Sequence, residues 1–450
     1  MQESCARRTR DPYDPVPMNV TYRQVVALAV PVMLANISVP LVGIVDTAVM
    51  GRYASPDYIN AVAIASVLFS SIFWAFGFLR MGTGGLIAQA FGKRDSTEVA
   101  LATARGLSVA IVVGMLIVAC GPVWFRAGMH FMTADTQLKD LVYAYYQIRL
   151  FAAPATLSLY VVFGTLIGLQ RMHSLMALTL MLNLCNITLN VTLYQTTDWH
   201  VRGVAAATLV SEYLTLAFGL WLIRKQVTPV VTHWHELKSR FSNPIAFVRL
   251  WQISRDLFIR TSCLTLAFYW MTVLGSRQGA YVLAANTILL HLLNLMAHWL
   301  DGFAHAAESL AGAAYGRRDR VAFNRAIHIC FQSALVLSLT ISAVYLIFGE
   351  YLVKLFSPNE SILEETMRYF WWVVVSPLIG VWSFTLDGIF TGITHTRAMR
   401  NGMLLALLSF FLCTLLVFPT MNNNGLWLSY SVLLLTRAAT LGFALRRIQF

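Results

Sequence analysis

Twelve long apolar stretches follow one another along this sequence, separated by short polar or charged segments. Each is close to the roughly 20 residues that an α-helix needs to cross the hydrocarbon core of a bilayer. With 58% hydrophobic and 12% charged residues, the chain cannot form a water-facing surface. Such a surface normally has about 25% charged residues. The sequence therefore predicts an all-α membrane protein with twelve transmembrane helices.

The spans that we predict are 22–49, 58–86, 99–122, 138–168, 173–195, 202–224, 248–274, 279–313, 324–348, 362–390, 398–419 and 425–446. The apolar stretch after Pro31 is too long for a signal peptide and lacks a small-residue cleavage site, so we interpret it as the first helix. The six cysteines are scattered singly, without a CxxC pair, and predict neither a metal site nor a cofactor.

The net charge of +12 is unevenly distributed over the predicted loops. Basic residues gather on one side of the proposed topology, in the stretches 7–10, 93–94, 224–249, 317–320 and 446–447. By the positive-inside rule, both termini are expected in the cytoplasm, with the chain in a bacterial inner membrane. The basic balance is then a topology signal, and we expect no nucleic-acid partner.

The sequence repeats itself at a shift of 224 residues. The clearest match aligns GKRD at 92–95 with GRRD at 316–319, and landmarks in the flanking helices follow in the same order. Two six-helix halves that enter the membrane in the same sense are typical of parallel-repeat transporters, with substrate binding near mid-membrane between the halves. The predicted organisation is a tail over 1–21, a lobe over 22–224, a linker over 225–247 and a second lobe over 248–447.

Ionisable residues inside the predicted spans are the best functional pointers, because each costs at least about 2.5 kcal/mol at the centre of a bilayer. In the eighth span six polar residues follow one another at spacings of 3, 4, 3, 4 and 3, namely His291, Asn294, His298, Asp301, His305 and Glu308. These spacings place all six on one helical face. We expect the stripe to line an aqueous cavity and to bind protons or substrate.

Asp46 lies near the end of the first span, which contains Pro31 and Pro40, with Asn36 nearby. Proline at depth frees backbone carbonyls and permits bending, so Pro40 is a candidate hinge. A lone carboxylate here is a candidate ion or proton site. A structural ion pair with Arg80 or Arg105 is the alternative.

Three asparagines of the fifth span, Asn183, Asn186 and Asn190, share one helical face. Together with Asp46 they could form a small cation or proton pocket. Amide bonding between helices is an equally good explanation of the spacing. Asp387 in the tenth span is a further carboxylate at depth, whereas we interpret the cluster at 255–260 mainly as structural ion pairing.

The sequence resembles the multidrug and toxic compound extrusion (MATE) family, in its DinF-like branch. The stretches that carry the resemblance are VDTAVMG at 45–51, GFLRMG at 77–82, LDGF at 300–303 followed by Ala307-Glu308, and LDG at 386–388. It covers nearly the whole chain, including the repeat. It implies a V-shaped pair of six-helix bundles that export amphipathic, often cationic compounds in exchange for protons or sodium ions.

The resemblance also assigns residues. The family's acidic residue of the first helix falls on Asp46, its fifth-helix Asn on Asn186 and its sixth-helix Thr on Thr208. The fifth-helix Asp of many members is Asn190 here, and this weakens a sodium site, so proton coupling is favoured. We expect a monomer that binds small organic compounds.

Protonation of Asp46 is expected to let the first helix bend at Pro40 and to lower substrate affinity. Two other functions stay open at this point. A lipid-linked sugar flippase of the same superfamily would show a strongly cationic cavity. A membrane-embedded enzyme would use His298, His305 and Asp301, but no catalytic signature supports it.

Overall fold

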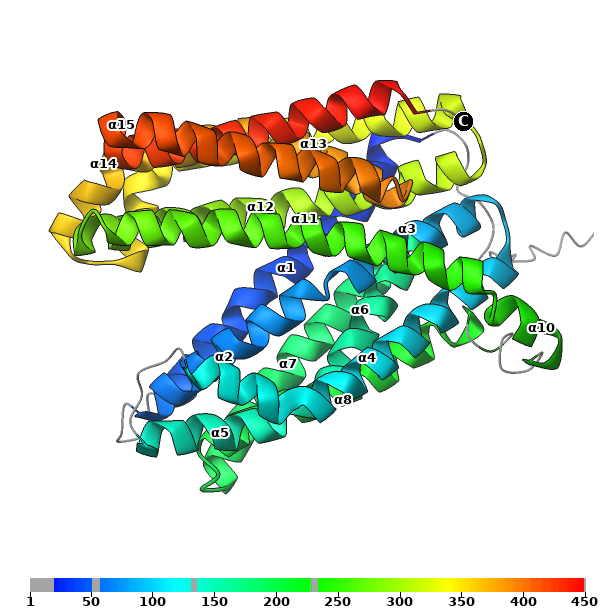
Figure 1. Ribbon diagram of the computed structural model, residues 1–450, viewed down its shortest axis with the longest axis horizontal. Coiled ribbons are helices and arrows are strands. Elements are labelled where there is room, and N and C mark those ends of the chain that lie inside the picture. Colours follow the sequence, from blue (N-terminus) through cyan, green and yellow to red (C-terminus); the bar gives the residue numbers. More distant parts are fainter. Residues whose placement is uncertain (1–19, 51–56, 131–135, 227, 229–233, 449–450) are drawn as a thin grey trace, which may run out of the picture.

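The structure is a computed structural model, and it describes residues 20–50, 57–130, 136–226, 228 and 234–448 (Figure 1). Within these ranges every regular element is a helix. The helices of the first half are α1 (Tyr22–Met50), α2 (Asp57–Ala75), α3 (Phe78–Gly92), α4 (Ser96–His130), α5 (Thr136–Leu150), α6 (Ala153–Gly168), α7 (Met172–Thr196) and α8 (Val201–Leu222). A short helix, α10 (Trp234–Phe241), precedes the second half.

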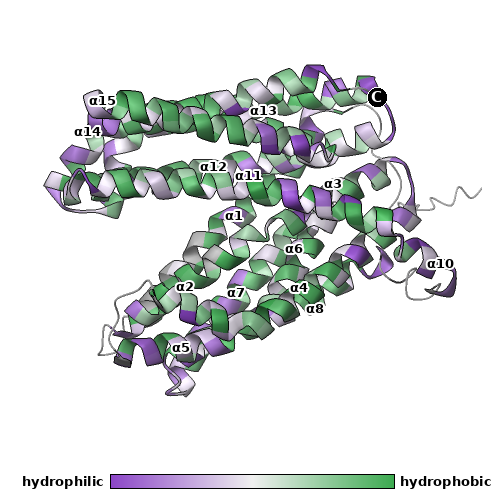
Figure 2. Cartoon of the chain, in the orientation of Figure 1, coloured by the Kyte–Doolittle hydropathy of each residue, from purple (hydrophilic) through white to green (hydrophobic). Residues whose placement is uncertain are grey.

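The second half contains fewer but longer helices. They are α11 (Pro244–Ser276), α12 (Ala280–Gly316), α13 (Arg320–Phe356), α14 (Glu360–Gly392) and α15 (Thr396–Arg446). Apolar residues cover the helices between their two ends (Figure 2), as expected for segments surrounded by lipid.

Ten helices of the described residues are long and apolar enough to cross a membrane, with α2 and α3 counted as one span. The pair α5 and α6, bent by 50°, is an eleventh if it counts as one span. α15 itself consists of two helices, because the backbone leaves helical geometry at Asn422. Ser409 and Thr436, on either side of this turn, are joined by a 3.0 Å hydrogen bond, so the two parts fold back on each other. When the two parts of α15 are counted separately and α5 with α6 is counted as one span, the total is the predicted twelve spans.

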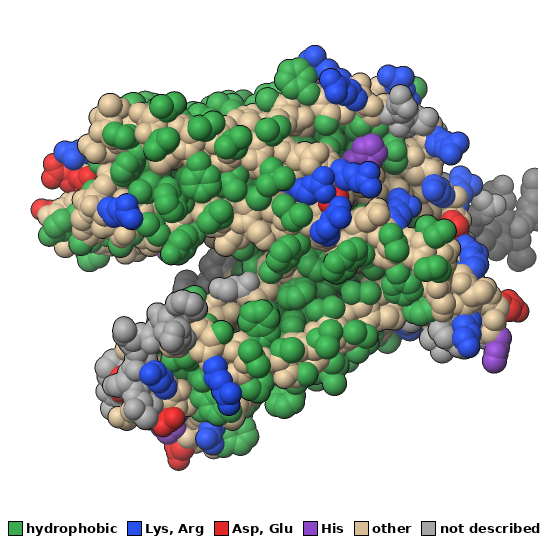
Figure 3. All heavy atoms as spheres, viewed as in Figure 1, with side chains coloured by type: hydrophobic (Ala, Val, Ile, Leu, Met, Phe, Trp, Pro, Cys, Tyr) green, Lys and Arg blue, Asp and Glu red, His purple; other side chains and the backbone are tan. Residues whose placement is uncertain are grey.

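The two halves form two helical bundles that meet at one end and diverge toward the other (Figure 1). In Figure 3 the bundles, here called lobes, are separated by a cleft at their diverging end, and Lys and Arg side chains concentrate toward the joined end. The joined end carries the turns at 93–95 and 317–319, α10 and Arg446. We call it the basic end, and the opposite end the open end.

The predicted repeat is visible in the backbone at the basic end. Arg94 and Arg318, which are 224 residues apart, both have φ of 59°. Asp95 and Asp319 each accept a hydrogen bond from the backbone N–H three residues later, both at 2.9 Å, and so cap equivalent helices. The shared GKRD and GRRD sequences therefore encode the same turn in both lobes.

Two equivalent glycines allow the lobes to pack closely against each other at the basic end. A Cβ added to Gly92 would lie 2.0 Å from the carbonyl oxygen of Ala313, and one added to Gly316 would lie 2.2 Å from that of Gln89. Ala313 is the repeat equivalent of Gln89, so the two contacts are related by the same pseudo-symmetry. Only glycine permits α3 and α12 to approach this closely.

Helix α1 crosses from one lobe to the other. Near the basic end the Tyr22 hydroxyl bonds Gln332 of α13, and farther along the Asn36 amide donates to the carbonyl of His298 at 2.9 Å. Ser38 then accepts a 2.5 Å hydrogen bond from Asn183 of the first lobe. The helix is continuous through Pro31 and Pro40, because membrane helices tolerate proline without breaking.

The predicted linker is attached to the first lobe rather than hanging free between α8 and α11. The Arg105 guanidinium on α4 donates to the carbonyls of Arg240 at 2.7 Å and Phe241 at 3.2 Å. It also pairs with Glu98 at 2.9 Å. The part of the linker that can move when the lobes move is therefore the short stretch between Phe241 and the start of α11 at Pro244.

Candidate transport site

A chain of polar side chains joins α7 to α8 inside the first lobe. The Asn190 amide donates to the Asn186 side-chain oxygen at 3.1 Å, and the Asn186 amide donates to the Thr208 hydroxyl at 3.0 Å. Asn183 lies one to two turns away and binds Ser38 of α1. All three asparagines are buried. The structure thus brings together the four neutral residues predicted for this site.

Asp46 is part of α1, but its side chain and that of Pro40 lie outside the described residues. The position of Asp46 along the helix can still be related to α7. Ser38 contacts Asn183, and both helices cross the membrane in the same direction, as the first and fifth spans. Asp46 is eight residues beyond Ser38 and Asn190 is seven beyond Asn183, so the two positions are at the same depth.

The predicted stripe of α12 changes from exposed to buried along its length. His291 and Asn294 are exposed, His298, Asp301 and His305 are half-buried, and Glu308 is buried. His291 stacks on the ring of Phe356, and the His298 ring bonds the carbonyl of Asn294 at 2.7 Å. The stripe therefore runs from the open end toward the contact between the lobes.

Glu308, at the buried end of this stripe, lies between the lobes. Only 2% of its surface is exposed. One carboxylate oxygen is 3.2 Å from the His305 ring and 3.9 Å from the guanidinium of Arg80 on α3. The other oxygen, Oε1, has no hydrogen-bond partner among the described residues. A buried carboxylate with an unused acceptor atom is able to bind a proton or a cation.

The space for Glu308 exists because its repeat equivalent is Gly84. A Cβ at Gly84 would lie 2.4 Å from Oε1 of Glu308. The two equivalent positions thus face each other across the lobe contact, one carrying a carboxylate and the other no side chain. The duplicated fold is here chemically asymmetric.

Asp387 of α14 is held by two guanidinium groups. Arg260 of α11 and Arg437 of α15 both bind its carboxylate, and Arg437 Nε donates to Oδ1 at 3.1 Å. Of the residues at 255–260 that we interpreted as structural ion pairing, Arg260 pairs across the lobe with Asp387 rather than with Asp256. Asp256 pairs with Arg255 and, at 2.8 Å, with Arg400, which agrees with a structural role.

These groups form one electrostatically connected set inside the molecule. Asp301 and Arg80 are both close enough to Arg260 to act on its charge. Arg80 in turn reaches His305 and Glu308. The alternative pairing of Asp46 with Arg80 or Arg105 stays a prediction, because the Asp46 side chain lies outside the described residues.

One buried ion pair was missed by sequence reasoning. Glu212 of α8 binds Arg149 of α5 at 2.7 Å and also accepts from the hydroxyl of Thr156. Both charges lie in predicted spans, and the cost of a charge in lipid was the signal that could have singled them out. Arg437, in the last predicted span, is a further buried charge that sequence reasoning missed, and the same cost could have singled it out.

We expect Asp387→Asn to destabilise the protein strongly. It leaves the buried guanidinium of Arg437 and the half-buried one of Arg260 facing a neutral amide, and removal of one partner from a buried ion pair typically costs about 3–5 kcal/mol. The measurement is thermal unfolding in detergent, with Glu350→Gln as the control. Glu350 forms an exposed pair with Lys354, and its loss should leave the unfolding temperature unchanged. Equal unfolding temperatures for the two variants would contradict the assignment.

Comparison with known proteins decides the family. The MatE family model matches residues 31–192 and again residues 257–420, once in each lobe. The chain belongs to the MatE family. It is 36% identical to DNA damage-inducible protein F of Escherichia coli (strain K12) over 93% of this chain and 91% of that protein. The predicted resemblance to the DinF-like branch of the MATE family is thereby confirmed.

More distant MATE proteins cover the same length. Multidrug resistance protein NorM of Vibrio vulnificus (strain CMCP6) is 22% identical over 93% of this chain and 94% of that protein. The solved outward-facing conformation of a multidrug resistance MATE family transporter shares the fold with a TM-score of 0.85, 20% identity and 95% coverage of this chain and 96% of that chain. As a MATE family member, the protein is a multi-pass membrane transporter and not an enzyme.

Proposed function

We propose that this protein is a proton-coupled antiporter that exports amphipathic or cationic organic compounds across a bacterial inner membrane by alternating access. One observation carries the proposal. The two lobes are tightly joined at the basic end and separated at the other, with acidic residues placed between and beside them. Such an arrangement exposes a central site to one side of the membrane at a time.

The orientation follows from charge. The positive-inside rule places the basic end, and with it both termini, in the cytoplasm. The cleft then opens to the outside, and the structure corresponds to the state that releases substrate and takes up protons. Substrate export in exchange for inward proton flow is consistent with a monomer, because each chain contains both lobes.

Proton coupling is favoured over sodium coupling by the composition of the first-lobe site. Its neutral residues bond one another, in the order Asn190, Asn186 and Thr208. Asp46 is the carboxylate that α1 carries at this depth, and Glu212, one turn from Thr208 on α8, is already paired with Arg149 at 2.7 Å. A sodium ion is better held by more than one unpaired acidic ligand. In our proposal Asp46 binds the proton, α1 bends at Pro40, and substrate affinity of the first lobe falls, so that substrate and proton exclude each other.

The transport assay that tests this proposal varies the two ion gradients independently. Purified protein in proteoliposomes should accumulate a fluorescent organic cation when a pH gradient is imposed without sodium. A sodium gradient at constant pH should drive no accumulation. Accumulation driven by the sodium gradient alone would contradict proton coupling. Chemical conversion of the compound without its movement across the membrane would contradict a transport function.

The flippase alternative is disfavoured by the charge balance near the lobe contact. The guanidiniums of Arg80, Arg260 and Arg437 are matched there by three carboxylates, those of Asp301, Glu308 and Asp387. A site for lipid-linked phosphates would be strongly cationic. The histidines are engaged with the backbone or with Glu308, which gives an enzyme no nucleophile to activate.

A further inference from the structure

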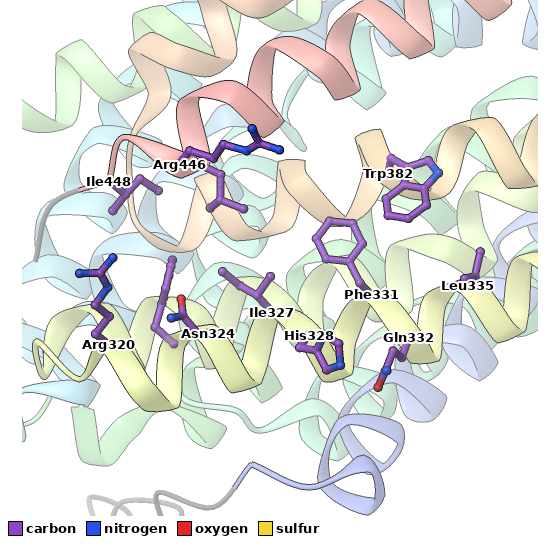
Figure 4. Close-up of a pocket in the computed structure, with 12 residues that line it drawn as sticks. Arg320, Asn324, Ile327, His328, Phe331, Gln332, Leu335, Trp382, Arg446 and Ile448 are labelled. Atoms are coloured by element: carbon purple, nitrogen blue, oxygen red, sulfur yellow. The ribbon is translucent and has the colours of Figure 1, made fainter.

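A groove on the second lobe does not belong to the cleft between the lobes. It has a volume of about 540 Å³ and lies between α13 and the C-terminal end of α15, with Trp382 of α14 beside it (Figure 4). Val321, Val336 and Phe443, on the helices that flank it, are all strongly exposed. Large exposed apolar side chains on a membrane helix face lipid. The groove therefore opens to the bilayer.

Two arginines line this groove. Arg320, at the start of α13, and Arg446, at the end of α15, line it at the basic end of the molecule. None of the lining residues that the structure describes is acidic. Both arginines line the same groove, and in Figure 4 the Arg320 side chain lies at the end where α13 begins, whereas that of Arg446 points toward the middle of the groove.

The end of the groove at Trp382 is mostly apolar, with Gln332 as its polar residue. Ile327, Phe331 and Leu335 follow on α13, and the Phe331 ring lies 5.5 Å from that of Trp382, which is 44% exposed. From Arg320 to Leu335 the helix rises by about 22 Å. This is roughly the thickness of one leaflet with its headgroup region, since a whole bilayer measures about 40–45 Å.

We propose that this groove is a binding site for an anionic phospholipid of the inner leaflet. Arg320 and Arg446 hold the phosphate, and an acyl chain lies along Phe331, Leu335 and Trp382. Basic pockets between membrane helices on the cytoplasmic side recognise anionic headgroups in this way. The proposal rests on the proposed orientation of the basic end, and not on the nature of the transported compound or of the coupling ion.

The site has a structural connection to the moving parts of the transporter. Gln332, at the end of the groove beside Trp382, accepts a hydrogen bond from the hydroxyl of Tyr22 on α1. α1 is the helix that crosses between the lobes, so a lipid in the groove lies beside its cytoplasmic end. Bound lipid should therefore favour the joined state of the basic end.

The test measures lipid binding directly. Purified protein in neutral detergent is titrated with phosphatidylglycerol that carries brominated acyl chains, and with brominated phosphatidylcholine, while tryptophan fluorescence is recorded. Trp382→Phe identifies the part of the quenching that comes from the groove. We expect phosphatidylglycerol to quench this part at about 30-fold lower concentration. The factor follows from about 1 kcal/mol for each of two basic residues near the surface.

Matched variants separate the groove from general basicity. R320A combined with R446A should abolish the preference for phosphatidylglycerol. K225A combined with K238A removes the same amount of charge from exposed sites of the cytoplasmic side. This double variant should keep the preference for phosphatidylglycerol. Equal loss in both double variants, or no headgroup preference in the wild type, would overturn the proposal. If glycerol phosphate alone, at a concentration similar to that of the lipid, prevents the brominated lipid from quenching the fluorescence, the groove is a site for soluble anions instead.

Discussion

Asp46→Asn should uncouple export from the pH gradient. An amide at this position cannot take up or release a proton, so the change that lets α1 bend and lowers substrate affinity no longer follows pH. Coupling free energies between sites are typically about 1–3 kcal/mol, which corresponds to about 5- to 150-fold. We expect gradient-driven export in proteoliposomes to fall by a factor in this range, and substrate binding at low pH to resemble that at high pH.

The control is Asp140→Asn, which changes an exposed acid of the same lobe in the same way. It should leave both export and the pH dependence of binding as in the wild type. Because loss of activity alone could reflect misfolding, binding at high pH must be retained by Asp46→Asn. An Asp46→Asn variant with unchanged pH-driven export would contradict the proposed role of Asp46 in proton coupling.

The spans and the duplication were predictable because each follows from a local pattern in the chain. Several spans predicted from hydropathy over about 20 residues agree with the helices within a few residues, for example 173–195 against α7, whereas α4 and α13 each end eight residues beyond the predicted span. The GKRD and GRRD turns recur because a helix end and a capping Asp need only a few adjacent residues. The longest discrepancy is α15, where two predicted spans are joined by a tight turn at Asn422.

The partners of the buried charges were not predictable in the same way. Spacing placed the six stripe residues on one face of α12, but it could not show that Glu308 faces Gly84 across the lobe contact. Asp387 is joined to Arg260 and Arg437 over 127 and 50 residues of sequence. Such pairings depend on how helices of one bundle rotate against each other, and periodicity contains no information on this rotation.

Replacing Gly92 and Gly316 together by Ala should prevent the basic end from closing. Each new Cβ would overlap a backbone carbonyl oxygen of the other lobe, at 2.0 Å and 2.2 Å, and a backbone atom cannot rotate away. Overpacking of this kind costs typically about 1–3 kcal/mol, here only in the joined state. The population of the outward-open state should fall by about 5- to 150-fold, and with it the export rate.

The change of state can be measured between the lobes at the open end. Spin labels at D140C and E350C, on α5 and α13, should report a shorter distance in the double variant, because opening of the basic end brings the opposite ends together. Gly442→Ala is the matched control, since a Cβ there meets no atom within 4 Å. A folded double variant with wild-type distance and export would show that the lobes alternate about some other contact than α3 with α12.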